Sequence, residues 1–168
     1  MPIERSRIES PLGPIALAVE DDQLCALDFI DSEARRRAPR RAAGWIAERV
    51  AAYFAGEVRA LDDIPVAPAG TPFQLRVWAE LRRIPVGQTR SYQEVAAALG
   101  APSASRAVGA ANGRNPIPLV VPCHRVIAST GALHGYGGGL WRKEWLLRHE
   151  GALPPDLFDG PGATLRAP

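Results

Sequence analysis

A cysteine and a histidine stand side by side at positions 123 and 124, and an arginine follows them. A thiol becomes a strong nucleophile when a neighbouring base or positive charge helps to remove its proton. Because adjacent residues on a strand point to opposite sides, we expect His124 to reach Cys123 through a bridging water. A carboxylate behind the imidazole would set its tautomer, and Glu150 is the available candidate. Spacing alone leaves both nucleophilic catalysis and a purely structural pair open.

The other cysteine, Cys25, lies in an apolar run, where we expect a small buried core residue. Two cysteines are too few for a disulfide scaffold, and both are expected to be free thiols. No CxxC pair exists, and no cluster of His, Cys, Asp and Glu has the spacing of metal ligands. The sequence therefore predicts no metal and no cofactor.

Composition limits the class of protein. The chain has 168 residues, of which 46% are apolar and 23% charged, and this suits one packed domain or two small ones. Disorder throughout, a coiled coil and collagen are excluded. No apolar run is long enough to cross a bilayer, and no apolar segment follows the first charged residues as in a secretion signal. We expect a cytoplasmic protein without a membrane partner.

Charge is spread unevenly along the chain. Residues 1–70 carry a net charge of −3, whereas residues 71–150 carry +6, and 19 of the 20 basic residues are arginine. Such asymmetry indicates a polyanionic partner such as DNA, although a compositional bias would give the same pattern.

The first part of the chain reads as a small α/β domain, residues 1–69. Apolar runs within residues 3–30 predict a three-stranded antiparallel meander with a polar turn at 20–23. Apolar residues at helical spacing predict a helix over 42–54, which Gly56 ends. The proline-containing stretch 60–70 is expected to be a linker.

The second part, residues 70–151, reads as mostly helical. Thr71 and Ser91 each begin a capping box, and the helices that follow are expected to end near Pro85 and Gly100. A further short helix over 104–112 makes a winged-helix-like helix-turn-helix with the helix before it. Its small residues indicate either close approach to a partner or tight packing against a neighbouring helix.

Three further segments complete this reading. Residues 119–121 are expected to form a short buried strand that leads to Cys123. A final helix carries Trp141 and Trp145, and residues 152–168, rich in Pro and Gly, are expected to be a disordered tail.

Residues 122–126 read Pro-Cys-His-Arg-Val. This segment resembles the active-site motif of the O6-alkylguanine-DNA alkyltransferases, the methylated-DNA–protein-cysteine methyltransferases. The resemblance covers residues 70–151 in order and with matching gaps. Its other motifs are Gly70-Thr71-x-Phe73-Gln74-x-x-Val77-Trp78, Ile84-Pro85-x-Gly87-x-Thr89-x-Ser91-Tyr92, Arg106-Ala107-Val108-Gly109-x-Ala111-Asn112, Asn115-Pro116, Gly135-Tyr136-x-Gly138-Gly139 and Lys143-x-x-Leu146-Leu147-x-x-Glu150.

The resemblance implies a single-turnover DNA repair protein that flips O6-alkylguanine out of double-stranded DNA. Cys123 would accept the alkyl group irreversibly, and His124, through a water, and Glu150 would activate it. Tyr92 would contact the flipped nucleotide and its base. Asn115 would bond the turn between the recognition helix and the active site.

The resemblance also implies a DNA surface and a base pocket. The helix-turn-helix would lie in the minor groove, Arg106 would fill the space that the flipped base leaves, and Ala107, Ala110 and Arg114 would join it in DNA binding. The residues expected to line the base pocket are Pro118, Val126, Tyr136, Gly137 and Gly138. We expect a monomer. Gly137 replaces a polar residue of some relatives, which affects the expected range of alkyl sizes.

Three alternatives remain at this stage. The first is a non-catalytic lesion-binding protein of the same fold, against which Cys123 argues directly. The others are a Cys-His hydrolase unrelated to DNA and a transcription factor that reads the major groove, for which the alanine-rich helix offers few side chains.

Overall fold

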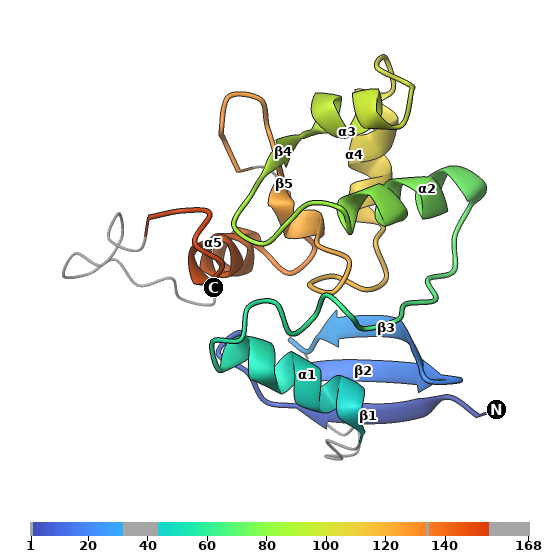
Figure 1. Cartoon of the computed structure of the whole chain (residues 1–168), viewed down its shortest axis with the longest axis vertical. Helices are drawn as coiled ribbons and strands as arrows, with labels where there is room; N and C mark the ends of the chain where they lie inside the picture. The colour runs from blue at the N-terminus through green and yellow to red at the C-terminus, as the bar shows by residue number, and fades with distance from the viewer. Residues whose placement is uncertain (1, 32–43, 134, 155–168) are drawn as a thin grey trace. The chain divides into compact units, whose positions relative to one another are not determined.

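The chain folds into two compact units in the computed structural model (Figure 1). The structure describes residues 2–31, 44–133 and 135–154. One unit comprises Met1–Ala69 and Pro116–Val120, and the other comprises Gly70–Asn115 and Val121–Pro168. The predicted C-terminal domain is therefore interrupted: residues 116–120 belong with the first unit, where the Leu27 N–H donates to the Pro116 carbonyl at 3.0 Å.

The first unit contains the expected antiparallel meander. Its strands, in the order β1-β2-β3, are β1 (Glu4–Ile8), β2 (Ile15–Glu20) and β3 (Gln23–Phe29). Asp21 and Asp22, with φ of 49° and 59°, make the whole β2–β3 turn. Two consecutive left-handed residues are typical of the tight hairpin turn whose twist matches that of its strands.

Helix α1 (Trp45–Phe54) lies on one face of this sheet (Figure 1). Its buried residues Ile46, Val50 and Tyr53 confirm the helical spacing, and the first predicted residues, 42 and 43, lie outside the described part. Cys25 is only half-buried, so the expectation of a core cysteine was wrong. A register shift at Ala18/Val19 accompanies this, and β3 turns Leu24 and Leu27 into the core instead.

The second unit is mostly helical, with one short parallel strand pair. Its elements are α2 (Pro72–Leu81), β4 (Arg90–Ser91), α3 (Tyr92–Ala98), α4 (Ser105–Gly113), β5 (Val126–Ile127) and α5 (Leu140–His149). Helix α2 packs against α4, where the Trp78 Nε1–H donates to the Ala111 carbonyl at 2.8 Å. These helices position the segment that carries Cys123.

Both predicted capping boxes are present. The Thr71 hydroxyl accepts the Gln74 N–H while the Gln74 side chain accepts the Thr71 N–H, and Ser91 and Glu94 repeat this exchange. The cap at Ser91 fixes where α3 begins, and so fixes the position of Tyr92, its first residue.

The expected strand over 119–121 is wrong. These residues form a turn, because Leu119 adopts a left-handed φ of 77° that ends any extended run. Cys123–Arg125 then form a single 3₁₀ turn, in which the Arg125 N–H donates to the Pro122 carbonyl at 3.0 Å. Cys123 and His124 therefore do not alternate across a strand, and their side chains are set by this turn.

The end of α5 is also more ordered than expected. The N–H groups of Ala152 and Leu153 both donate to the Leu147 carbonyl, at 2.8 and 3.3 Å, so the predicted tail does not begin at 152. Residues 155–168 lie outside the described part. Among the helices of the described ranges, none has the length and apolar character needed to cross a membrane.

The cap of α2 gives a stability prediction. Replacing Thr71 by Ala removes a side-chain acceptor for one of the free N–H groups of the helix, so we expect a loss of about 1 kcal/mol in the free energy of unfolding. Urea denaturation measures it. Ser103→Ala, in the exposed turn before α4, is the control and should change stability by less than about 0.5 kcal/mol. Equal losses for the two variants would contradict the capping role.

Candidate active site

Cys123 begins the 3₁₀ turn and is buried, with 5% of its surface exposed. Two asparagine side chains hold the backbone on either side of it. The Asn115 Nδ2 donates to the Val121 carbonyl at 2.7 Å, and the Asn112 Nδ2 contacts the Cys123 carbonyl at 3.4 Å. Because Asn112 belongs to α4 and Asn115 follows it, the end of that helix fixes the position of the thiol.

His124 and Glu150, far apart in the sequence, meet in the interior of this unit. His124 Nε2 lies 2.8 Å from Glu150 Oε1, and neither side chain is exposed. Arg125 lies against the same carboxylate: its Nε and Nη2 donate to the two Glu150 oxygens, both at 2.9 Å. Glu150 therefore joins two consecutive residues of the turn.

Burial, charge and hydrogen bonding decide the protonation states of Glu150 and His124. Burial alone would raise the pKa of Glu150, but the charges and hydrogen bonds of His124 and Arg125 lower it to about 2. Burial lowers the pKa of His124, against the pull of Glu150. Around neutral pH a carboxylate thus faces a neutral imidazole, and Nε2 must carry the hydrogen that it donates to Glu150.

This tautomer leaves the other ring nitrogen as a base. Nδ1 carries a lone pair, is buried, and has no hydrogen-bond partner among the described residues. The site therefore holds a neutral imidazole with its basic atom free to take a proton.

The thiol itself is not activated at rest. Burial raises the pKa of Cys123 to about 11, although a hydrogen bond from Asn115 and the charge of Lys143 oppose this. At neutral pH the sulfur therefore keeps its proton, and a reaction that uses it as a nucleophile needs a base.

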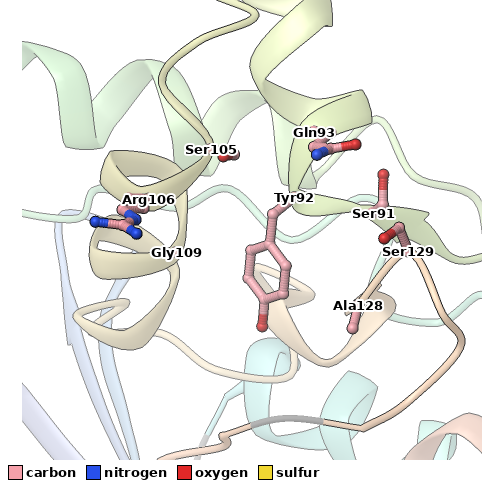
Figure 2. Close-up of a pocket in the computed structure, with 8 residues that line it drawn as sticks. All are labelled: Ser91, Tyr92, Gln93, Ser105, Arg106, Gly109, Ala128 and Ser129. Atoms are coloured by element: carbon pink, nitrogen blue, oxygen red, sulfur yellow. The ribbon is translucent and has the colours of Figure 1, made fainter.

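A cavity of about 340 Å³ opens beside α3 and α4 (Figure 2). Its lining residues are Ser91, Tyr92, Gln93, Ser105, Arg106, Gly109, Ala128 and Ser129. The Tyr92 ring projects between α4 and the segment with Ala128 (Figure 2), and a Cβ on Gly109 would lie only 3.7 Å from that ring. Burial, and then the charge of a Cys123 thiolate, raise the pKa of Tyr92, so its hydroxyl remains a proton donor.

The remaining predicted residues are distributed as follows. The residues expected to bind DNA are exposed on α4 or directly after it: Arg106, Ala107, Ala110 and Arg114. Val126 is buried in β5. The Tyr136 hydroxyl is buried too, and burial, followed by the charge of a Cys123 thiolate, raises its pKa. Gly137 is exposed, and the Gly138 carbonyl accepts the Arg142 Nη1–H at 2.8 Å. Pro118 is half-buried in the first unit.

Sequence reasoning missed two buried basic residues. Arg125 had no assigned role beyond its place in the motif, and Lys143 had none beyond a motif match. Lys143 is fully buried and its Nζ donates to the Val126 carbonyl at 2.7 Å. It is the single lysine in a chain with 19 arginines, which is a signal that could have drawn attention to it. The described residues hold no cluster of His, Cys, Asp and Glu suited to a metal ion.

The fold and this site define a two-domain protein with a buried cysteine beside a histidine–carboxylate pair. Family models agree: residues 3–68 match the 6-O-methylguanine DNA methyltransferase ribonuclease-like domain, and residues 72–152 match the DNA-binding domain of the same family. The chain belongs to the 6-O-methylguanine DNA methyltransferase family.

Individual relatives agree with this assignment. The chain is 49% identical over 166 residues to the methylated-DNA–protein-cysteine methyltransferase of Mycolicibacterium paratuberculosis, covering 94% of this chain and 99% of the relative. Identity to the enzyme of the same name from Salmonella typhimurium is 45%, with 88% and 95% covered. A crystal structure of Mycobacterium tuberculosis O6-methylguanine methyltransferase superposes with a TM-score of 0.78 at 44% identity, over 93% of this chain and 98% of that one.

A second crystal structure, of Mycobacterium tuberculosis OGT in complex with DNA, gives a TM-score of 0.77 at 45% identity, covering 88% of this chain and 92% of the other. Taken together, these matches establish the activity. The protein repairs DNA by direct reversal, transferring an alkyl group to one of its own cysteines.

The raised pKa of Cys123 predicts an unusual pH dependence of the rate at which this thiol is alkylated. In a Cys25→Ser variant, Cys123 is the remaining thiol, and its reaction with iodoacetamide should still accelerate up to about pH 10, because the thiolate population keeps growing towards a pKa of about 11. Mass spectrometry of the quenched protein measures the rate. A rate that levels off below about pH 9 would contradict burial as the dominant influence on this thiol.

Proposed function

We propose that Cys123 is the alkyl acceptor, that O6-alkylguanine in double-stranded DNA is the substrate, and that His124 and Glu150 activate the thiol. The observation that carries this proposal is the 2.8 Å contact between His124 Nε2 and Glu150 Oε1, which places the hydrogen of the buried, neutral imidazole on Nε2 and leaves Nδ1 as its base. Cys25, by comparison, lies half-buried in β3 of the other unit, with its Sγ 3.6 Å from the Gln23 carbonyl.

The transfer is a displacement at the alkyl carbon. The Cys123 proton passes to His124 Nδ1, directly or through one water, and the sulfur forms a bond to the carbon as its bond to guanine O6 breaks. Guanine leaves with the electron pair, and the Tyr92 hydroxyl, whose raised pKa keeps it protonated, can donate to the developing negative charge. The thioether product is a poor leaving group, so each molecule acts once.

The proposed DNA surface is the α3–α4 pair, used as a winged-helix-like helix-turn-helix. Ala107 and Ala110 are exposed on α4, and such small side chains would let its backbone approach the floor of a minor groove. Arg106, in the first turn of the same helix, and Arg114 at its end supply positive charge. The +6 charge of residues 71–150 fits a phosphate backbone as partner.

The alkylated base must leave the stack to reach a buried sulfur, which costs a few kcal/mol in unstacking. Arg106 is proposed to offset part of this by entering the duplex, since its guanidinium is planar and can hydrogen-bond. The residues of the second unit proposed to receive the base are Tyr92, Asn115, Val126, Tyr136, Gly137 and Gly138. Gly137 is exposed and a Cβ there would meet nothing within 4 Å, so a side chain at this position would not collide with the described residues.

One chain supplies all the groups of the proposed reaction, so we expect a monomer to be the active form. We expect it to act in the cytoplasm, in contact with the double-stranded DNA that it repairs. No cofactor enters the proposed chemistry.

The acceptor is tested by Cys123→Ala. This variant should keep its affinity for DNA and lose all transfer, because the nucleophile is gone while α3 and α4 are untouched. Intact-mass measurement after mixing with DNA that contains O6-methylguanine should find one methyl group per molecule in the parent and in the Cys25→Ser control, and none in Cys123→Ala. A methylated Cys123→Ala protein would assign the acceptor elsewhere.

The role of Arg106 is tested by comparing two substrates. Arg106→Ala should slow transfer from duplex DNA about tenfold or more, yet barely change reaction with free O6-alkylguanine base, which needs no extrusion. Arg83→Ala is the matched control, because it removes the same charge from an exposed position at the end of α2. An equal loss on both substrates would contradict the role of Arg106 in base flipping.

A further inference from the structure

Arg125 makes three side-chain hydrogen bonds in the interior of the second unit. Two go to the oxygens of Glu150, at 2.9 Å each, and the third runs from Nη1 to the Ile84 carbonyl at 2.7 Å. Only 6% of its side chain is exposed. A guanidinium so placed has a defined orientation, because its planar set of donors matches the two carboxylate oxygens.

The same residue joins the proton relay to the segment that leads to Tyr92. Ile84 lies after α2, and Arg125 directly precedes β5, which pairs in parallel with β4 at Val126↔Arg90. Gly87, in the intervening loop, has a φ of 83°, and a Cβ there would lie 3.2 Å from the Glu150 carbonyl oxygen. Glu150 thus packs against this loop both through Arg125 and through its own backbone.

We propose that Arg125 is a positioning residue for alkyl transfer: by binding both oxygens of Glu150 and the Ile84 carbonyl, it holds the Glu150–His124 pair in the arrangement in which Nδ1 of His124 can accept the thiol proton. This rests on the proposed function of Cys123, His124 and Glu150. Arg125 does not touch the reacting atoms, and it acts through Glu150.

The direction in which loss of Arg125 changes the pKa values of Glu150 and His124 can be predicted. Its positive charge helps to hold the pKa of Glu150 low, and it also lowers the pKa of His124. Without it, both groups take up a proton more readily as the pH falls. A protonated Glu150 can donate to Nε2 and so place the imidazole hydrogen on Nδ1, whereas a protonated His124 has no lone pair, and either change stops proton acceptance from the thiol.

Other groups also face this pair. The charge of Lys143 from α5 lowers the pKa of His124. The charge of Glu150 raises the pKa of Tyr136, which lies in the loop before α5. Cys123 lies one residue away on the same turn. All three remain in an Arg125 variant, so they contribute equally to the two proteins that are compared.

The experiment measures single-turnover transfer to the full-length protein from duplex DNA with O6-methylguanine, between about pH 5 and pH 9, for the parent and for Arg125→Gln. The pH at which transfer falls to half of its plateau should rise by at least about one unit. The rate ratio of parent to variant should accordingly be about tenfold larger on the acidic side than at the plateau. A profile parallel to that of the parent, merely lower, would show a structural role alone and overturn the proposal.

Two further variants keep the result interpretable. Arg125→Lys retains the charge with fewer donors, and should shift the profile in the same direction by a smaller amount, which also serves if Arg125→Gln does not fold. In a Glu150→Gln background, replacing Arg125 should shift the profile clearly less than it does in the parent, because only its direct effect on the pKa of His124 remains. A shift as large as in the parent background would contradict the proposal.

Identifying the methylated residue distinguishes a failure of the proposed function from a failure of the proposed role of Arg125. A methyl group on a residue other than Cys123 overturns the proposed function itself. A methyl group on Cys123, combined with an unshifted profile for the Arg125 variants, overturns only the role of Arg125.

Discussion

One buried carboxylate organises the site. Glu150, at the end of α5, accepts hydrogen bonds from both His124 and Arg125, so a single side chain fixes the turn that carries the nucleophile. A buried charge is costly unless it is fully paired, and breaking such a pair destabilises a protein by several kcal/mol. The pairing of Glu150 thus serves stability and chemistry together, because it determines which nitrogen of His124 is basic.

The parts of the second unit that the sequence predicts are those determined by local chemistry. The capping boxes at Thr71 and Ser91 each need only four consecutive residues, and both helices begin where these residues place them. The meander of the first unit follows likewise from apolar runs and a polar turn. From its residues alone the sequence offered Glu150 only as an available carboxylate, and its role in the relay came with the resemblance to a known family, since the 25 residues between His124 and Glu150 carry no local sign of the contact.

The failures have physical causes too. An apolar triplet at 119–121 reads as a strand, but the left-handed backbone of Leu119 makes it a turn, and no periodicity reports the sign of φ in a leucine. No sequence pattern indicated that Lys143 and Arg125 are buried, because lysine and arginine are usually exposed, and their partners are a carbonyl and a carboxylate supplied by distant segments. Buried cations of this kind are visible only once the fold brings their acceptors near.

The central claim is that His124 is neutral and carries its hydrogen on Nε2, where Glu150 accepts it. The most direct measurement is the ¹⁵N NMR spectrum of the His124 side chain in the unreacted protein at about pH 7. The account predicts one protonated nitrogen, Nε2, and an unprotonated Nδ1 that stays so well below the usual pKa of histidine. A hydrogen on Nδ1, or an imidazolium with both nitrogens protonated at this pH, would contradict it.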